Sequence, residues 1–148
     1  MRCGLAVLTA IALLLTGCGN EVRPVAYTDL TRAAGPLEFT RIKRQLFRDR
    51  AELMEFLAEQ NPGHPLRLPP IDFARQEVYL VATGPRSSTG YDLRIVRVQD
   101  EGDNIVVVVR EQTPSLGDPV EARVTYPFRL IALPRNDKSV TLKWLGRP

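Results

Sequence analysis

The sequence has very few of the side chains that catalytic and metal sites usually need. Its 148 residues include two cysteines, one histidine and one tryptophan. A structural zinc site needs four convergent ligands, usually cysteine and histidine, and His64 has no second histidine to join it. The serines lack a general base for the same reason, because His64 stands alone in a proline-rich loop. We therefore expect no catalytic residue, no metal site and no cofactor.

The sequence also lacks a strong excess of charge of either sign. Twenty basic and seventeen acidic residues are interspersed and give a net charge of +3. Nucleic-acid-binding domains usually cluster lysine and arginine along one face. The one dense basic stretch here is residues 41–50, so the pattern argues against nucleic acid as a partner. We interpret this stretch as a solvated face, with contact to anionic lipid head groups as the alternative.

No apolar run is long enough to span a bilayer, which takes about twenty residues. The longest run, residues 5–15, follows the positively charged Arg2 and ends in Leu15-Thr16-Gly17-Cys18. This order resembles the lipobox of bacterial lipoproteins, in which small residues precede the cysteine that is lipidated. The resemblance implies that residues 1–17 are a signal peptide and that Cys18 carries acyl chains such as palmitate. An ordinary secretory signal with a chance cysteine is the alternative.

Lipidation at Cys18 predicts a location at the bacterial cell envelope. Two or more acyl chains hold a protein stably on a bilayer, whereas one chain holds it only marginally. Cys3 leaves with the signal peptide, so the mature chain has neither a disulfide nor a free thiol. Residue 19 is glycine instead of the aspartate that marks inner-membrane retention in enteric bacteria. We therefore expect a protein anchored in the outer membrane and facing the periplasm.

The rest of the chain predicts one β-rich domain behind a tether. Residues 18–35 show no sustained hydrophobic period, so we assign them to the lipidated cysteine and a flexible tether, and residues 36–148 to the domain. The Asp49 side chain is in place to cap a helix, with Glu52 three residues on. Six segments have strand patterns: residues 37–47, 77–82, 91–98, 105–110, 120–133 and 140–144.

This set of elements predicts an α+β fold that is mostly β. About six strands and one helix are compatible with an antiparallel sheet or with a small sandwich or barrel. Residues 105–110 are almost continuously β-branched, which is typical of a central strand that is buried on both faces.

The candidate binding surface lies on the loops between these strands. Loops on a rigid β scaffold are the usual place for recognition. One loop runs into Ser88-Thr89-Gly90-Tyr91 and has glycines at 84 and 90 that can take positive φ. A second loop, residues 113–119, contains Ser115. We interpret Ser88, Thr89, Gly90, Tyr91 and Ser115 as candidate partner-binding residues, with a structural role for the Gly-Tyr step as the alternative.

These pieces together resemble the C-terminal domain of PrcB, a subunit of a bacterial surface protease complex. The resemblance spans about residues 39–144. It rests on the order of seven pieces. They are the strand and helix ending in Leu57, the proline-rich loop into Ile71-Asp72-Phe73, the strand at 78–82, Thr89-Gly90-Tyr91 running into Leu93-Arg94-Ile95, the loop at Pro114, Thr125-Tyr126-Pro127-Phe128 and the run 130–134. The usual family form has a second glycine before the tyrosine. The resemblance implies a small β-rich domain without enzymatic activity, which in some members binds or stabilises a partner protease.

Three functions follow as hypotheses. The first is a non-catalytic protein-interaction module whose partner is an envelope protein or protease. The second is a protease inhibitor, because Thr89-Gly90-Tyr91 resembles the Thr-Thr-Gly-Tyr loop of chagasin-type inhibitors, although their other two loops have no counterpart here. The third is a structural envelope lipoprotein whose basic residues 41–50 lie on membrane or cell-wall polymer.

Overall fold

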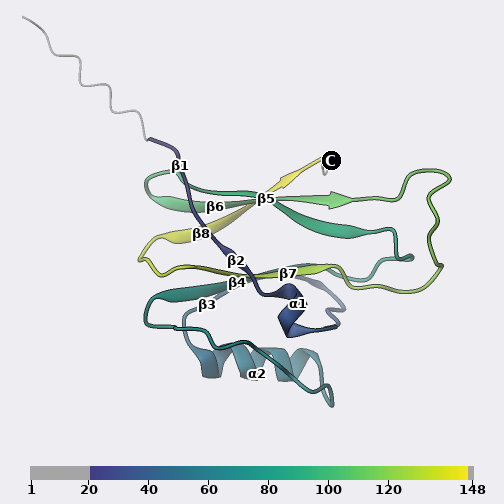
Figure 1. The fold of residues 1–148 in the computed structure, drawn as a ribbon, viewed down its shortest axis with the longest axis horizontal. Helices are drawn as coiled ribbons and strands as arrows, with labels where there is room; N and C mark the ends of the chain where they lie inside the picture. Colours follow the sequence, from purple (N-terminus) through teal and green to yellow (C-terminus); the bar gives the residue numbers. More distant parts are fainter. Residues whose placement is uncertain (1–20, 147–148) are drawn as a thin grey trace, which may run out of the picture.

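A computed structural model describes residues 21–146 of the chain (Figure 1). The eight strands are β1 (Arg23–Pro24), β2 (Thr28–Asp29), β3 (Ile42–Phe47), β4 (Gln76–Thr83), β5 (Asp92–Asp100), β6 (Asn104–Gln112), β7 (Phe128–Pro134) and β8 (Ser139–Leu145). The two helices are α1 (Thr31–Ala34) and α2 (Arg50–Gln60). The predicted α+β, mostly β class is confirmed.

The strands form two sheets that lie one above the other, with α2 below the second (Figure 1). Sheet A has the order β1-β5-β6-β8, and sheet B has the order β2-β7-β4-β3. Every neighbouring pair is antiparallel except β6 and β8, which run parallel. Of the architectures that the sequence leaves open, the structure is therefore the sandwich. The parallel pair departs from the purely antiparallel expectation.

Sheet B is the middle layer and is buried on both faces. Tyr79 and Val81 of β4 face sheet A, where they pack in one cluster with Val107 of β6. Leu80 of β4 faces the opposite way and packs in a second cluster with Leu53 of α2. Because successive side chains in a strand point to opposite faces, β4 contributes to both cores, and its residues from Glu77 to Thr83 are all buried.

The first described residues form an arm that crosses the edge of both sheets (Figure 1). β1 pairs with the end of β5, and β2 pairs with β7. Leu30 and Ala34 are buried in the core under sheet B. The Leu30 N–H donates to the Leu130 carbonyl at 2.8 Å, and the Leu130 N–H donates to Thr31 Oγ1 at 3.0 Å. Residues 23–34 of the expected tether are thus part of the folded domain.

The predicted helix is confirmed, including its start at Asp49. Asp49 Oδ1 accepts hydrogen bonds from the N–H groups of Ala51 at 2.7 Å and Glu52 at 3.2 Å. At the other end, Asn61 is buried; its side-chain oxygen accepts from the Glu38 N–H at 2.7 Å and its amide group donates to the Leu57 carbonyl at 3.2 Å. Asn61 therefore ends the helix and ties it to the segment before β3.

Two predicted strands are shorter than expected. Residues 37–41 are not part of β3, although Leu37 and Phe39 are buried. Residues 120–127 form a loop, and only Phe128–Pro134 is a strand. The alternating pattern of 120–127 has no sheet neighbour apart from one isolated bridge between Arg86 and Thr125. Pro127 also lacks the N–H that would continue the ladder.

Candidate functional site

Two loops extend from one end of the sandwich, at the right in Figure 1. Residues 84–91 connect β4 to β5, and residues 113–127 connect β6 to β7; we call them the tip loops. Arg86 and Thr125 exchange two backbone hydrogen bonds, of 2.8 and 2.9 Å. The Thr89 N–H donates to the Glu121 carbonyl at 3.1 Å. The tip loops are therefore joined to each other beyond the end of the sheets.

Side chains of the first tip loop strengthen this junction. Thr89 Oγ1 accepts a hydrogen bond from the Glu121 N–H at 3.0 Å. The Thr125 hydroxyl donates to the Ser88 carbonyl at 2.8 Å, and Ser88 itself is only 8% exposed. Ser88 and Thr89, two of the predicted binding residues, are thus held in the contact between the tip loops.

Gly90 is the point of closest approach between the tip loops. A Cβ atom at this position would lie 2.5 Å from Pro114 Cβ and 2.6 Å from Val120 Cγ1. These separations are far below van der Waals contact, so a side chain does not fit unless the second loop moves. Positive φ, expected at both glycines, occurs at Gly84, with φ 77°, and not at Gly90. Gly90 is needed for a different reason, because a side chain there would collide with the second tip loop.

An ion pair that the sequence analysis missed fixes the first tip loop to sheet A. Arg86 Nε contacts Glu111 Oε1 of β6, and Arg86 Nη2 lies 3.0 Å from Glu111 Oε2. Both side chains are mostly buried. Arg86 also donates to the carbonyl oxygens of Thr83 at 3.2 Å and Pro85 at 2.9 Å. A two-pronged pair of this kind fixes direction as well as distance, so the tip is rigid at its base.

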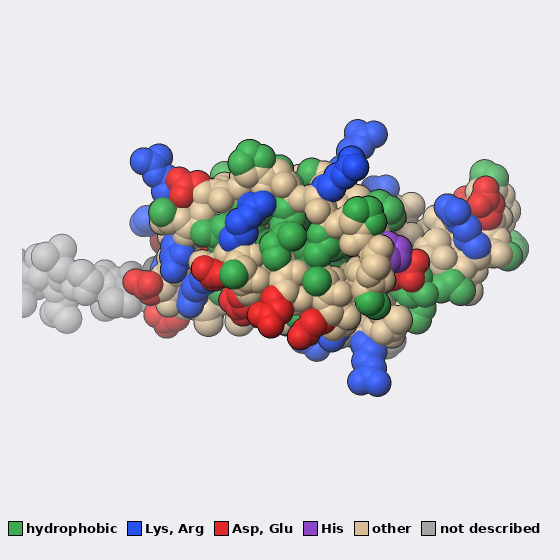
Figure 2. Space-filling model, turned by 90° about the horizontal axis from the view of Figure 1, so that it is seen from below, with side chains coloured by type: hydrophobic (Ala, Val, Ile, Leu, Met, Phe, Trp, Pro, Cys, Tyr) green, Lys and Arg blue, Asp and Glu red, His purple; other side chains and the backbone are tan. Residues whose placement is uncertain are grey.

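The second tip loop carries exposed apolar side chains. Leu116 is fully exposed, and Val124 and Val120 are 61% and 41% exposed. Leu116 follows Ser115, whose N–H donates to Asp118 Oδ2 at 2.6 Å and shapes the turn at the loop's end. Figure 2 shows a protrusion at the right, where apolar, acidic and basic side chains stand side by side. The tip is therefore a mixed surface with an apolar component.

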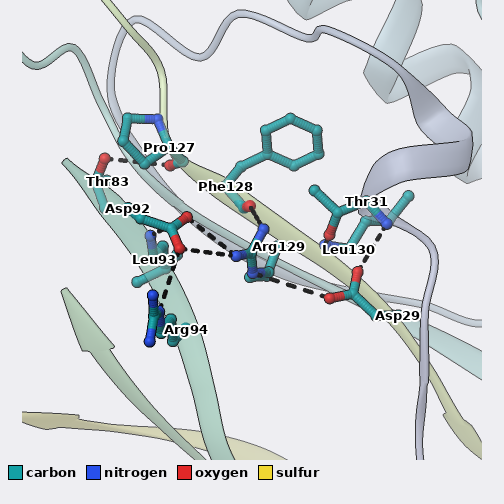
Figure 3. Close-up of polar contacts among 10 residues, drawn as sticks. All are labelled: Asp29, Thr31, Thr83, Asp92, Leu93, Arg94, Pro127, Phe128, Arg129 and Leu130. Carbon is teal, nitrogen blue, oxygen red and sulfur yellow. Dashed lines mark hydrogen bonds and ion pairs between the residues drawn. The ribbon is translucent and has the colours of Figure 1, made fainter. Parts of the chain in front are cut away.

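A second charged junction joins the two sheets and the N-terminal arm (Figure 3). Arg129 of β7 is 22% exposed and lies between two carboxylates. Its Nη2 is 3.0 and 3.2 Å from the two oxygens of Asp92 on β5, and its Nε is 3.9 Å from Asp29 of β2. Asp29 in turn accepts a hydrogen bond from the Thr31 N–H at 2.9 Å. This junction sits where β5 begins, directly after the first tip loop.

The basic stretch at residues 41–50 is not one surface. Lys43 lies over the Phe56 ring of α2, 5.5 Å from its centre. Arg48 pairs with the fully buried carboxylate of Glu77 at 2.9 Å. Arg44 faces the other side of β3, close to Tyr79. Burial raises the pKa of Tyr79, and the positive charge of Arg44 partly offsets this rise. A common contact of all these side chains with a membrane is therefore not supported.

Three predicted site residues remain to be located: Tyr91, Ser115 and Cys18. Tyr91 is half-buried at the end of the first tip loop, directly before β5, and Ser115 is exposed on the second tip loop. Cys18 lies outside the described residues. No group of three or more potential metal ligands occurs within residues 21–146. In the same part of the chain, no helix is long and apolar enough to cross a membrane.

Residues 78–134 match the model of the PrcB C-terminal family. This match supports the resemblance to the PrcB C-terminal family over these residues. No curated protein and no solved structure matches it.

Residues 78–134, which we call the PrcB segment, contain both tip loops in full. This segment runs from β4 to β7 and includes both tip loops, the Arg86–Glu111 pair and the Arg129–Asp92 contact. The match is narrower than the expected 39–144, because it leaves out β3, α2 and β8. The segment that the family shares is thus the part of the fold that builds the tip loops and places them beside the sandwich.

Proposed function

We propose that this protein is a membrane-anchored envelope lipoprotein that acts as a non-catalytic interaction module, with the tip loops as its contact surface. The observation that carries the proposal is the exposure of Leu116, Val120 and Val124 on one loop. Apolar residues scattered singly on a surface are ordinary, whereas a cluster in one place indicates an interaction site. Charged residues of the same loop, such as Glu121 and Arg123, would form the polar rim that surrounds such contacts.

The bracing of the tip loops supports the same proposal. A loop that must be ordered on binding lowers the affinity, because its conformational freedom is lost at that moment. The contact at Gly90 and the Arg86–Glu111 pair hold this tip in one arrangement before any partner arrives. A tip that is braced at its base and carries exposed apolar side chains is suited to enter a preformed groove on a folded partner.

We propose an envelope protein as the partner, with a protease as the first class to test. The PrcB segment supports this choice, because the resemblance implies that some family members bind or stabilise a protease. The anchor at Cys18 would keep the module in the outer membrane on the periplasmic side.

The test is photocrosslinking in the native membrane. A photoreactive residue placed at Leu116 of the full chain should capture one protein in near-stoichiometric yield. The same residue at the exposed position Glu59 of α2 should capture little. Mass spectrometry of the adduct identifies the partner and shows whether it is a protease.

A matched pair of variants tests the surface. Leu116→Ser, Val120→Ser and Val124→Ser together should reduce recovery of the partner at least tenfold. The control replaces three exposed apolar residues elsewhere, Val22→Ser, Ile42→Ser and Val96→Ser. Equal recovery by the two triple variants would show that the tip is not the contact surface.

Chagasin-like inhibition is the weaker proposal. Ser88 is buried and Thr89 is bonded to Glu121, so this part of the first loop faces its neighbour and not a protease cleft. Strong inhibition of a papain-type protease by micromolar full chain, lost in Thr89→Ala and kept in Ser115→Ala, would favour the inhibitor over the interaction module.

A further inference from the structure

The outer face of sheet A carries a group of exposed basic side chains. Because side chains alternate along each strand, the buried residues Leu93 and Val107 and the half-buried Leu142 point toward sheet B, and their neighbours point outward. Four exposed basic residues point outward, and we call them the basic face: Arg94, Arg97, Arg110 and Lys143. Among residues 21–146, no other layer of the fold covers this side of sheet A (Figure 1).

The strand register gathers these four side chains in two adjacent rows. Arg94 is directly opposite Arg110. In the next row Val108 lies between Arg97 and Lys143. Val108 points outward and yet is fully buried, which we attribute to the aliphatic stems of its two basic neighbours. The charged ends of these neighbours are then left at the surface.

Few acidic groups balance the basic face. Asp92 is 3.4 Å from Arg94, but both its oxygens also bind Arg129. Arg97 donates to Gln99, which is neutral. Within residues 21–146 no ion pair involves Arg110 or Lys143. Like charges directly opposite each other destabilise a sheet, so the Arg94–Arg110 pair would gain from an anion between them. A hollow of about 390 Å³ lies there, lined by both arginines and the bulge at Val96.

The N-terminal arm brings the predicted anchor to the same sheet. β1 is the edge strand of sheet A, and Arg23 pairs with Asp100 at the end of β5. Cys18 lies five residues before Arg23 in the sequence. Five residues span at most about 17 Å even when fully extended. A lipid on Cys18 therefore holds the edge of sheet A close to the bilayer surface.

We propose that the basic face rests on anionic phospholipid head groups of the membrane that holds Cys18. The proposal rests on the anchor in the proposed function and adds an orientation to it. With sheet A toward the bilayer, α2 faces away from it and the tip loops project to the side. Each basic residue near an anionic surface strengthens binding by roughly fivefold, so loss of three should weaken this orientation on the order of 100-fold.

Fluorescence quenching in reconstituted vesicles tests the orientation. The full chain is purified from membranes and placed in phosphatidylcholine vesicles with or without about one third phosphatidylglycerol. Single cysteines are labelled at Thr141→Cys on the outer face of sheet A or at Glu55→Cys on α2, since no other free thiol is expected. A quencher attached to the head groups should quench the label at 141 several times more than the label at 55. This difference should require phosphatidylglycerol and should disappear at high salt.

Two triple variants with the same net charge test whether the basic face, and not the overall charge, sets the orientation. Arg97→Gln, Arg110→Gln and Lys143→Gln together should remove the difference between the labels. Arg41→Gln, Arg44→Gln and Arg67→Gln, which lower the charge equally at other exposed positions, should preserve it. Equal quenching of both labels, or equal effects of the two triple variants, would overturn the proposal. If the wild-type chain floats with neither kind of vesicle, the anchor in the proposed function is wrong, and the orientation that depends on it is wrong as well.

Discussion

Gly90 has no room for a side chain. Its missing Cβ would lie 2.5 Å from Pro114 and 2.6 Å from Val120, both on the opposite tip loop. We expect Gly90→Ala to lower the free energy of unfolding by about 1–3 kcal/mol, the usual cost of forcing extra atoms into a packed site. Urea unfolding of the full chain measures it. Ser115→Ala, an exposed change on the same tip, should stay within about 0.5 kcal/mol of wild type. If the two variants have equal stability, the approach at Gly90 is not tight.

Arg48 and Glu77 form an ion pair, and loss of either side chain should lower the free energy of unfolding by a different amount. Glu77 is fully buried and accepts hydrogen bonds from Arg48 at 2.9 Å and Asn136 at 3.1 Å, whereas Arg48 is 43% exposed. Removal of Arg48 leaves a buried charge without a counter-ion, and such losses cost about 3–5 kcal/mol. Removal of the charge on Glu77 leaves an arginine that reaches water.

We therefore expect Arg48→Met to destabilise the protein more than Glu77→Gln, by at least about 1 kcal/mol in urea unfolding. Arg41→Met, which removes an exposed arginine from the same segment, is the control and should have little effect. A larger loss for Glu77→Gln than for Arg48→Met would contradict this account of the pair.

The N-terminal arm is an element that the sequence analysis assigned to a tether. Leu30 is buried in the core under sheet B, and its N–H bonds to Leu130 of β7. We expect Leu30→Ala to cost about 2–4 kcal/mol, because it leaves a cavity beside β7. The exposed Val22→Ala is the control. Denaturation followed by the fluorescence of Trp144 measures both, and a flexible tether would make them equal.

The turn between β5 and β6 should make stability depend on pH. The hydrogen bond from Lys138 to Asp100, at 2.5 Å, and then the one from the Gly102 N–H lower the pKa of Asp100 below its ordinary value of 3.8. Because the pKa is lower in the folded state, the carboxylate stabilises the fold above pH 3.8, and this contribution is lost as the pH falls through the folded-state pKa.

We expect Asp100→Asn to lower the urea midpoint at pH 7, and the gap to wild type to narrow as the pH falls below 3.8. Asp103→Asn, an exposed change in the same turn, is the control and should have little effect on the urea midpoint at pH 7. A gap for Asp100→Asn that stays constant from pH 7 to pH 3 would mean that the charge on Asp100 does not contribute.

Sequence patterns predicted the elements whose signals are local. The run of β-branched residues in β6 predicted a central strand, and Asp49 predicted the start of α2; both are confirmed. Patterns failed where the deciding partner is far along the chain. Thr31 of α1 bonds to Leu130, 99 residues away, so nothing near it in the sequence marks its contact with sheet B. Residues 120–127 alternate as a strand does, but no neighbouring strand lies along them.

The candidate site shows the same division between local and distant signals. Its place on the loops beside Gly90 was predictable from small residues and prolines. The Arg86–Glu111 pair was not, because 25 residues separate the two side chains and many other pairings were possible. The basic face was hidden for a different reason. Its four residues come from three strands, and only the register, including the bulge near Val96, places them side by side.

The whole molecule has two surfaces with different properties in the proposed arrangement. The basic face would meet the membrane, and the tip loops would extend along it toward a partner in the same membrane. This arrangement depends on a short link between Cys18 and β1. A long flexible link would let the domain turn freely, because the effective concentration of a tethered group falls with link length.

We therefore expect an insertion of fifteen Gly/Ser residues between Glu21 and Val22 to weaken the orientation. A flexible link of about twenty residues has an r.m.s. length of about 25 Å, enough to lift the basic face off the head groups. Quenching of a label at Thr141→Cys should fall, while the urea midpoint stays unchanged because β1 begins at Arg23.

The control places the same insertion after Gly63, in an exposed loop that is not part of the link. This variant has the same added mass and disorder, but its distance from Cys18 to β1 is that of wild type. Quenching at 141 should then stay at the wild-type level. If both insertions reduce quenching at 141 equally, the reduction comes from the added residues themselves and not from a longer link between Cys18 and β1. If neither does, the basic face binds head groups strongly enough to need no help from the anchor.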